Sequence, residues 1–370
     1  MMRKHSSYRV KRLVVWGTGN MGSAAIRSCL AFPGLELVGI ITSSAEKAGQ
    51  DAAALAGLHH ASGVVATTDI GAALADCDAV AYMASGDVRP DEAAADIERC
   101  LRVGAHVVTP SLYALYDPAS APADLRNRFT AAAETGGVSM FATGVDPGWV
   151  NDALPMAAAG LCTKIRAIHC QEIFDYSTYD QPFVVRELCG FGQSMDTLPL
   201  MLMPSVASMA WGGNIRLLGR TLGLEIDSVT ETAERRALAE SLDNAMGHFE
   251  KGSQGAFWLK IAGTSGGRER IVVDHITRID PNCAPDWPQP DQGAGDHRVI
   301  IDGDPRLEIV VRADVPGGTL ADGANTTAVN RLLGAIDWLV AQKPGIYDGS
   351  EVPLSAALPA VVAAERWRDD

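Results

Sequence analysis

Apolar and polar residues follow a repeating rhythm over the first 150 residues of the chain. Short apolar runs of the kind found in buried strands stand at residues 13–17, 35–42, 64–69, 78–85, 105–110 and 138–144. The segments between them carry apolar residues at helical spacing, most clearly 91–103. Strands that are separated by helices form a parallel sheet with right-handed crossovers. The pattern therefore predicts an α/β fold with a doubly wound (Rossmann) parallel sheet over residues 1–150.

A different rhythm begins after residue 150, where strand-like segments follow one another with few helices. These segments are residues 166–177, 224–236, 256–267, 269–280 and 307–314. They predict an α+β substrate-binding and dimerisation domain at 151–324 with an open, mostly antiparallel sheet. The Pro-rich segment 281–296 is expected to be an exposed loop. An amphipathic helix at 325–342 is expected to return to the first domain, which then includes 325–345 and leaves a tail at 346–370.

The stretch WGTGNMG follows the first predicted strand and opens the first predicted helix. Its glycines have the spacing GxGxxG, in which Gly17 allows the tight turn, Gly19 the approach of a pyrophosphate, and Gly22 close packing of helix and strand. The N–H groups at the start of the helix can bind phosphate oxygens. The residues expected to bind a dinucleotide here are Gly17, Thr18, Gly19, Asn20, Met21 and Gly22.

The end of the second predicted strand bears on the choice between the two nicotinamide dinucleotides. An acidic residue there would bind the ribose hydroxyls of NAD and repel the 2′-phosphate of NADP. The chain instead has Thr42, Ser43 and Ser44, with Lys47 close behind. Hydroxyl groups and a cation suit a phosphate, so NADP is the expected cofactor. Glu46 in the same segment keeps NAD open as the alternative.

The nicotinamide is expected beyond the carboxyl ends of the strands, where ligands of doubly wound sheets bind. Three strand ends carry small residues or proline there: YMASGD (82–87), VVTPSLYALYDP (107–118) and FATGVDPGWVND (141–152). A polar residue near the start of the last helix could also reach the nicotinamide amide. The residues predicted to contact this half of the cofactor are Ala84, Ser85, Thr109, Gly144, Pro147 and Asn330.

Composition and charge exclude several classes of protein. The 370 residues carry a formal net charge of −14 and a pI near 5.0, which speaks against nucleic acid or an anionic membrane as a partner. The apolar content of 47% supports a core, but no apolar run reaches the ~18 residues of a membrane helix. The seven cysteines are scattered without a CxxC pair, which is typical of a reduced cytoplasmic protein. No signal peptide and no metal-ligand spacing is recognised.

Four stretches resemble a known family: WGTGNMG, LELVGIITSSAEKAGQDAAALAG, ATGVDPGWVNDALP and HCQEIFDYSTYD. They are similar to actinobacterial proteins described by a dihydrodipicolinate reductase-like N-terminal domain, in a family that also contains 2,4-diaminopentanoate dehydrogenase and the native amine dehydrogenases. The resemblance implies a homodimer that uses NAD(P)H to reduce a C=N or C=O group of a small molecule. The dicarboxylate-binding His-His…Lys stretch of true dihydrodipicolinate reductases has no match here, so lysine biosynthesis is not expected.

The resemblance also implies a glutamate just after the fifth strand to handle ammonia, but this chain reads TPSLYALYDP there. A proton donor for a carbonyl substrate could instead be Ser111 or Tyr113. A carboxylate for reductive amination could be Asp146, Glu172 or Asp175. Because side chains alternate along a strand, Glu172 and Asp175 are expected to lie on opposite faces.

The expected function is that of an NAD(P)H-dependent, amine dehydrogenase-like oxidoreductase that reduces a ketone, an aldehyde or the imine formed from it. A carbonyl reductase with no ammonia step is the first alternative, and the missing glutamate favours it. A non-catalytic regulatory protein that binds NADP is the second. The segment 195–211, rich in Met, Leu and Pro, is interpreted as core, with a dimer interface or an apolar substrate pocket as alternatives. A pocket there would imply a partly apolar substrate.

Overall fold

The computed structural model describes residues 9–86, 89–179 and 181–354. The chain divides into two compact units whose parts are interleaved along the sequence. Unit 1 contains residues 1–112, 122–143 and 328–370, and unit 2 contains residues 113–121 and 144–327. The expected tail lies outside the described residues from residue 355 onward. No helix within the described ranges is long and apolar enough to cross a membrane.

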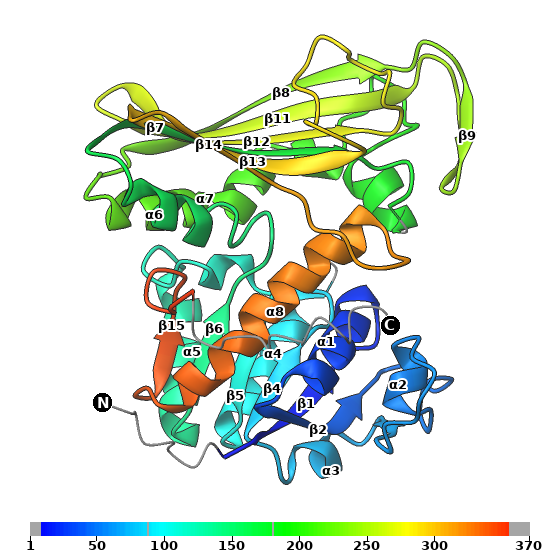
Figure 1. The fold of residues 1–370 in the computed structure, drawn as a ribbon, viewed down its shortest axis with the longest axis vertical. Coiled ribbons are helices and arrows are strands. Elements are labelled where there is room, and N and C mark those ends of the chain that lie inside the picture. Colours follow the sequence, from blue (N-terminus) through cyan, green and yellow to red (C-terminus); the bar gives the residue numbers. More distant parts are fainter. Residues whose placement is uncertain (1–8, 87–88, 180, 355–370) are drawn as a thin grey trace, which may run out of the picture. The chain divides into compact units, whose positions relative to one another are not determined.

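A parallel sheet of seven strands forms the centre of unit 1 (Figure 1). From edge to edge its strands are β15 (Gly345–Tyr347), β6 (Ser139–Ala142), β5 (His106–Thr109), β4 (Ala79–Tyr82), β1 (Lys11–Trp16), β2 (Leu35–Ile41) and β3 (Ala66–Thr67). Every neighbouring pair is parallel. The doubly wound α/β sheet predicted from the sequence is thereby confirmed. Strand β15 uses residues 346 and 347, which the sequence pattern assigned to a tail.

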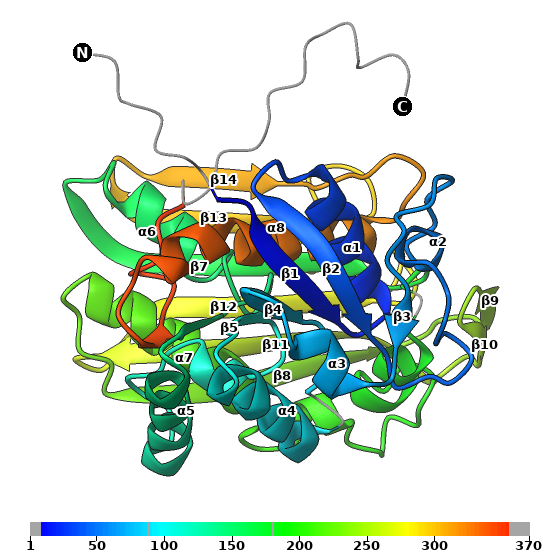
Figure 2. The ribbon, with the colours of Figure 1, turned by 90° about the horizontal axis from the view of Figure 1, so that it is seen from below.

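Helices cover both faces of this sheet (Figure 2). The helices of the unit are α1 (Asn20–Ala31), α2 (Ala52–Leu55), α3 (Ile70–Leu74), α4 (Pro90–Arg102), α5 (Ala123–Gly136) and most of α8 (Leu320–Val340). On the face of α1 and α8, Leu13 and Val15 of β1 share one apolar core with Ile336 and Leu339 of α8. On the other face α4 and α5 pack against each other. The strands are apolar on both faces because both faces are covered.

Unit 2 is built on a second sheet of six strands. Their order is β14 (Leu307–Val311), β13 (Gly295–Asp304), β7 (Lys164–Asp175), β12 (Arg268–Arg278), β11 (Gln254–Ser265) and β8 (Ser228–Ala237). Among these strands the β7–β12 pair is parallel and the other pairs are antiparallel, which confirms the predicted mostly antiparallel sheet. A small hairpin of β9 (Leu242–Asn244) and β10 (Gly247–Phe249) extends beyond the sheet (Figure 1).

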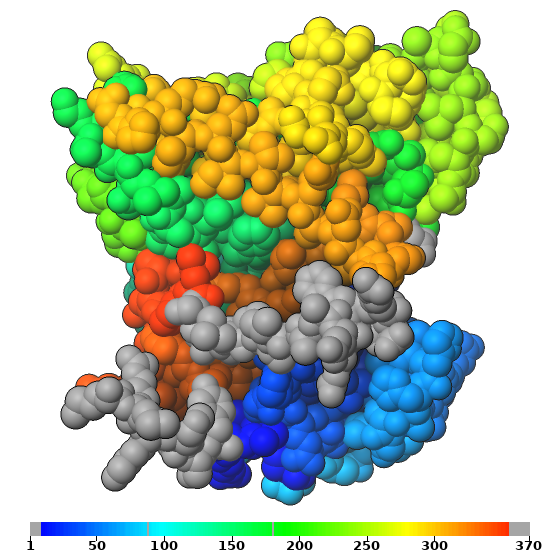
Figure 3. Space-filling model, in the orientation of Figure 1, coloured from blue at the N-terminus to red at the C-terminus, as the bar shows by residue number. Residues whose placement is uncertain are grey.

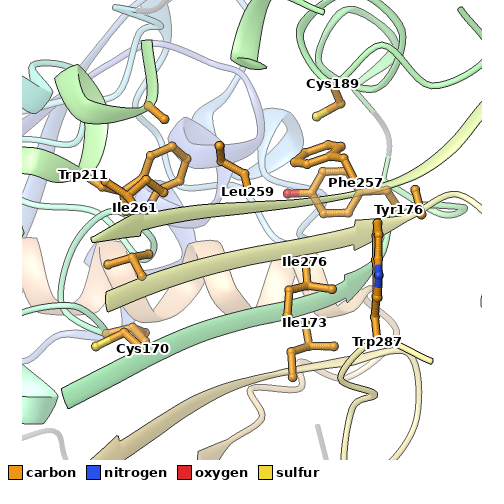
Figure 4. Packing of buried hydrophobic residues seen from close by; sticks show 14 of the residues in the cluster. Cys170, Ile173, Tyr176, Cys189, Trp211, Phe257, Leu259, Ile261, Ile276 and Trp287 are labelled. Atoms are coloured by element: carbon orange, nitrogen blue, oxygen red, sulfur yellow. The ribbon is translucent and has the colours of Figure 1, made fainter. Parts of the chain in front are cut away.

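The helices α6 (Ala153–Ala159) and α7 (Val206–Thr221) pack on one face of this sheet. Trp211 of α7 and Phe257 of β11 both belong to the buried core there (Figure 4). The carboxylate of Glu231 on β8 accepts a hydrogen bond from the N–H of Ser208, and so caps the first turn of α7. Three short helical turns complete the unit: η1 (Tyr113–Leu115), η2 (Val184–Leu188) and η3 (Leu200–Leu202).

Residues 281–294 form the predicted loop and most of them are exposed, but Cys283, Ala284 and Trp287 are buried against the other face of the sheet. Trp287 is 4% exposed, and its ring centre lies 6.1 Å from that of Trp258 on β11. The buried guanidinium of Arg278 donates hydrogen bonds to the carbonyls of Cys283 (3.0 Å) and Pro288 (2.8 Å). The apolar side chains of the segment cover sheet area that would otherwise face water. Figure 3 shows β13, β14 and this segment, in yellow to orange, at the surface of the unit.

Candidate functional site

The glycine turn of unit 1 leaves no room for a side chain at two of its three glycines. Gly17 has a φ of +112°, and a Cβ there would lie 2.9 Å from the backbone nitrogen of Ala84. A Cβ on Gly22 would lie 2.0 Å from the carbonyl oxygen of Gly17. Both contacts are with backbone atoms, which cannot move aside as a side chain can. The need for glycine at both positions therefore follows from the packing of the turn.

Gly19 differs from the other two, because a Cβ there would meet no atom within 4 Å. It is the N-cap of α1, and no side chain caps the helix at this residue. The N–H groups of Asn20 and Met21 lie in the first turn, where a helix provides no acceptor of its own. The positive end of the helix dipole favours an anion at this position. Open space in front of an uncapped helix start fits the pyrophosphate of a dinucleotide.

The residues predicted to choose between NAD and NADP lie beside this turn. The buried hydroxyl of Thr42 is 3.2 Å from that of Thr18 and accepts a hydrogen bond from the N–H of Ser44 (3.2 Å). The ammonium of Lys47 donates to the carbonyl of Thr18 (2.8 Å). Ser43 is exposed at the same strand end. The structure thus brings the predicted hydroxyls and the predicted cation together at the glycine turn.

The predicted residues after β4 and β5 form two loops that are joined by hydrogen bonds. The Thr109 hydroxyl donates to a carbonyl at the end of β4 (2.8 Å), and the Ser111 hydroxyl donates to the carbonyl of Ala84 (2.5 Å). Ser85 lies between Ala84 and Gly86 in the first of these loops. The loop passes so close to the second that a Cβ on Gly86 would be 1.9 Å from the carbonyl oxygen of Ser111. Thr109 and Ser111 therefore hold the two loops together beside the glycine turn.

Gly144 and Pro147, which the sequence assigned to the cofactor, lie in unit 2 and form a tight turn that carries Asp146. Gly148 has a φ of +148°, and a Cβ there would lie 2.1 Å from the carbonyl carbon of Gly144. The N–H of Gly148 donates to Oδ1 of Asn151 (3.2 Å). This turn holds the Asp146 side chain at the face of the six-stranded sheet that α7 covers.

Glu172 lies between two histidines on neighbouring strands of that sheet. In the strand register it pairs with His275 of β12 on one side and with His297 of β13 on the other. Its carboxylate is 3.4 Å from Nδ1 of His275 and 3.7 Å from Nε2 of His297, and it accepts a hydrogen bond from the Tyr176 hydroxyl (3.0 Å). Burial opposes the ionisation of Glu172, but the two histidines and Tyr176 outweigh burial and hold its pKa below the usual value.

Asp146 brings a second carboxylate to the same face. Its Oδ1 accepts a hydrogen bond from the indole N–H of Trp211, and its Oδ2 is buried without a hydrogen-bond partner. Burial, reinforced by the charge of Glu172, raises the pKa of Asp146 to about 6, although His297 and His275 act in the opposite direction. The side chain can therefore exchange a proton near neutral pH, as a general acid or base has to do.

Asp146, Glu172 and His297 each offer one atom that could contact a small cation, and these atoms lie within 4.8 Å of one another. We call these three residues, together with His275, the carboxylate–imidazole cluster. The sequence spacing predicts no such group, because its members come from three strands and a turn that are far apart in the chain. Neither histidine is singled out by the sequence analysis. Alternation along 269–280 could have placed His275 on the buried face with its apolar neighbours two and four residues earlier.

The remaining catalytic and cofactor candidates lie in different surroundings. Asp175 accepts a hydrogen bond from the N–H of Ser177 (2.8 Å) in a turn at the end of β7. Tyr113 lies in η1, with its ring centre 5.5 Å from that of Tyr116 in an edge-on contact. Asn330 is exposed on the part of α8 that belongs to unit 1. Of the three predicted carboxylates, the structure thus brings Asp146 and Glu172 together.

Two known families match successive parts of the chain. Residues 11–109 match the family described as dihydrodipicolinate reductase, N-terminus. Residues 149–366 match the family described as 2,4-diaminopentanoate dehydrogenase C-terminal domain. The second match alone covers more than half of the chain. The first match begins in unit 1, and the second begins in unit 2.

Individual relatives agree with these matches. The chain is 53% identical over 348 residues to an amine dehydrogenase of Streptomyces virginiae, which covers 93% of this chain and 97% of the relative. It is 23% identical over 256 residues, 68% of either chain, to a 2,4-diaminopentanoate dehydrogenase of Acetoanaerobium sticklandii. Among solved structures, that of an amine dehydrogenase from Mycobacterium smegmatis has a TM-score of 0.74 at 19% identity, covering 97% of this chain and 100% of the other. This last likeness shows a shared fold.

Proposed function

Because the chain belongs to the family of 2,4-diaminopentanoate dehydrogenase and the amine dehydrogenases, we propose that it catalyses the reductive amination of a small, partly apolar ketone or aldehyde. The same matches make it an NAD(P)-dependent oxidoreductase of the amine dehydrogenase-like type. The observation that carries the proposal is the carboxylate–imidazole cluster. It supplies acid–base groups in a chain that lacks the glutamate expected after β5.

The proposed reaction combines a carbonyl compound, ammonium, NAD(P)H and one proton to give a primary ammonium product, NAD(P)+ and water. The cofactor, when bound, supplies the hydride. The protein has to take a proton from ammonium so that the nitrogen lone pair can attack the carbonyl carbon, and it has to protonate the oxygen that leaves as water. Asp146, whose pKa burial raises to about 6, suits the first task at neutral pH. An ionised Glu172 would stabilise the cationic imine.

The test of this proposal follows the absorbance of NADPH with the purified protein and a panel of ketones and aldehydes, with and without ammonium. We expect oxidation of NADPH that depends on ammonium and that is fastest with apolar carbonyl compounds. Formation of the corresponding primary amine, detected by mass spectrometry, would account for the consumed NADPH. A complete lack of ammonium-dependent oxidation across the panel would refute reductive amination.

A carbonyl reductase is the second candidate function, and the loop TPSLYALYDP is the observation that favours it. That loop contains no carboxylate before its final aspartate, but it offers the hydroxyl of Tyr113 as a proton donor, whereas that of Ser111 donates to the carbonyl of Ala84. Oxidation of NADPH that is indifferent to ammonium and yields an alcohol would establish this activity in place of amination.

For the cofactor we propose a preference for NADP. The support comes from Thr42, Ser44 and Lys47, which lie at the end of β2 beside the glycine turn. Aspartate in place of Ser43 and Ser44 would put carboxylates where the 2′-phosphate is expected, and should lower NADPH affinity at least about tenfold with little effect on NADH. Tighter binding of NADH than of NADPH by the wild-type protein would contradict the preference.

We further propose that the protein is a cytoplasmic homodimer. Four side chains of the segment 195–211 are between 44% and 69% exposed: Leu198, Leu200, Met203 and Met209. For these residues the interpretation as core is wrong, and an exposed apolar group of this kind is typical of an interface. Light scattering after gel filtration should give twice the mass of one chain, and Met209→Glu should lower it. The described cysteines are all free, as in a reducing compartment.

A further inference from the structure

The carboxylate–imidazole cluster places two carboxylates in one site. Within the described ranges, neither Asp146 nor Glu172 forms an ion pair with a lysine or arginine. When His275 and His297 are neutral, the site therefore carries up to two negative charges. Buried charge without compensation is unfavourable, and a cation that contacts both carboxylates offsets that cost. The charge of the site thus calls for a positively charged ligand.

The hydrogen bonds of the cluster also leave several polar atoms without a partner. Oδ2 of Asp146 and both ring nitrogens of His275 are buried without a hydrogen bond. A neighbouring N–H or O–H group donates to one oxygen of each carboxylate, which leaves the other oxygen for a ligand. Nε2 of His297 lies 3.7 Å from this second oxygen of Glu172. Three acceptor atoms from three residues therefore surround a single position.

We propose that this cluster binds the nitrogen of the substrate, first as ammonium and then as the primary ammonium group of the product, in place of the glutamate expected after β5. The inference rests on the proposed function. A primary ammonium group has three N–H donors, and Asp146, Glu172 and His297 offer three acceptors. The three acceptor atoms lie within 4.8 Å of one another, with 3.7 Å between those of Glu172 and His297, so a single nitrogen between them can reach all three at hydrogen-bond distance.

The surroundings of the cluster favour an ammonium group over a divalent metal ion. The rings of Trp211, Phe257 and Tyr176 lie around His275, with ring centres 5.4, 5.6 and 6.3 Å from that of the imidazole. Aromatic faces attract ammonium groups. They provide no hydrogen-bond acceptors for the water molecules that a bound magnesium ion retains. Zinc, which accepts the same residue types as ligands, is the rival that the experiment has to test.

The two carboxylates have different tasks in this site. Glu172, whose ionised form accepts the hydrogen bond of the Tyr176 hydroxyl, stays charged as the anchor of the cation. Asp146 has the raised pKa and accepts a proton. In that step one N–H bond of ammonium breaks, its proton moves to Asp146, and the freed lone pair forms the C–N bond with the carbonyl carbon. Both residues are thus catalytic, and His297 orients the nitrogen between them.

The first experiment uses the protein without cofactor, so that binding is measured apart from turnover. Thermal unfolding is followed at about pH 8, where both carboxylates are ionised, in ammonium, methylammonium or sodium chloride at equal ionic strength. We expect the ammonium and methylammonium salts to raise the unfolding midpoint of the wild type above that in sodium chloride. The difference should vanish in Glu172→Gln and persist in Glu225→Gln, which removes an exposed carboxylate of the same unit.

The second experiment measures steady-state kinetics of the same variants. Glu172→Gln should raise the KM for ammonium at least about tenfold and change the KM for the carbonyl compound by less than about twofold, because a charge-assisted hydrogen bond is lost at the nitrogen alone. Asp146→Asn should lower kcat with the ammonium concentration held at saturation. A general effect on the fold would instead change both KM values together.

The outcomes separate this inference from the proposed function. Ammonium-dependent turnover with an unchanged KM for ammonium in Glu172→Gln would overturn the inference and leave the proposed function standing. Ammonium binding that requires Glu172, without amination of any carbonyl compound, would support the site and refute the function. Stabilisation by zinc chloride that requires Glu172, together with loss of activity on chelation, would identify a metal site and overturn the inference.

Discussion

The glycine turn of unit 1 and the carboxylate–imidazole cluster of unit 2 are made of different parts of the chain. The turn is made of backbone, and a Cβ at Gly17 or Gly22 would collide with other backbone atoms. The cluster is made of ionisable side chains that are buried or, in the case of Asp146, half-buried, and some of their hydrogen-bonding atoms have no partner. The turn is complete within six consecutive residues, whereas the cluster depends on the register of three strands.

This difference explains how the two sites can change independently. A backbone site recognises the pyrophosphate that every dinucleotide shares, and almost any substitution in it is harmful. A side-chain site can be rebuilt by replacing single residues on a sheet that stays the same. A chain can therefore lack the glutamate expected after β5 and hold its carboxylates at Asp146 and Glu172 instead, while the cofactor turn keeps its pattern.

The largest effect is expected from adding one methyl group to the turn. Gly22→Ala would place a Cβ 2.0 Å from the carbonyl oxygen of Gly17, so the turn has to open. We expect NADPH affinity to fall about 100-fold and the unfolding temperature to drop, since overpacking costs about 1–3 kcal/mol. Fluorescence titration with NADPH and thermal unfolding measure both effects.

Gly19→Ala is the matched variant, because its Cβ meets no protein atom within 4 Å. It should keep the unfolding temperature and weaken NADPH binding about tenfold, since the methyl group enters the space of the pyrophosphate. Gly160→Ala, whose Cβ would lie 3.7 Å from the nearest atom, should change neither quantity. Wild-type affinity in Gly22→Ala would show that the turn does not depend on its lack of side chains.

The next effect concerns the charge that the cluster buries. The pKa of Asp146 is raised from 3.8 to about 6, so its unfolded form ionises at a lower pH than its folded form. Stability from this group is complete below the unfolded pKa and is lost as the pH rises through the folded pKa. The groups that face this carboxyl are Glu172, His275, His297 and the N–H of Trp211.

The unfolding free energy of the wild type, relative to that of Asp146→Asn, should therefore fall by up to about 3 kcal/mol between about pH 4 and pH 7. Urea unfolding of both proteins across this range measures the difference. Ionisable groups that do not interact with Asp146 cancel in the comparison. If the difference in unfolding free energy between the two proteins stays constant with pH, a positive charge in the site balances the ionised Asp146.

A smaller effect is expected from Lys47, whose charged side chain contacts the backbone of the glycine turn. Lys47→Ala removes an ammonium that lies 2.8 Å from the carbonyl of Thr18. NADPH affinity should fall about tenfold, as for the loss of one charge-assisted hydrogen bond, and NADH affinity should stay within about twofold. Lys251→Ala, a surface lysine of unit 2, is the control. An equal loss for NADH would mean that Lys47 supports the turn rather than the 2′-phosphate.

The smallest effect is expected from Tyr176, which donates a hydrogen bond of 3.0 Å to Glu172. Tyr176→Phe removes a donor that favours the ionised carboxylate, so the pKa of Glu172 should rise. The acid limb of the pH profile of kcat/KM should move to higher pH, with a few-fold loss of rate at pH values below that limb. Tyr347→Phe, in the other unit, should leave the profile in place.

Local features of this chain could be predicted from the sequence, and features that depend on distant pairing could not. The parallel sheet, the glycine turn and the positions of Thr42 and Lys47 follow from residues that are close along the chain. Strand β13 is missing from the sequence analysis because the Pro- and Gly-rich segment before it hides its start. The burial of Trp287 is missed for a similar reason, since polar neighbours dominate the pattern around it.

The cluster is the clearest case of a feature that local pattern does not reveal. Alternation along β7 correctly separates Glu172 from Asp175 and so narrows the choice of carboxylate. The proximity of His275 and His297 to Glu172, however, depends on which strands lie beside β7 and in what register. The raised pKa of Asp146 follows from burial and from the charge of Glu172 nearby. Neither can be derived from the spacing of residues along the sequence.

The interleaving of the two units has a consequence for how the protein is made. Unit 1 is closed by Leu332, Ile336 and Leu339 of α8, which belong to its apolar core, and by the edge strand β15. A ribosome delivers these residues only after all of unit 2 has emerged. Until then α1 covers only part of one apolar face of the strands β1 to β6, and the rest is exposed to solvent, which favours aggregation or the binding of a chaperone. Translation that stalls before α8 would release a chain with an intact cofactor turn on a sheet whose one face is still only partly covered.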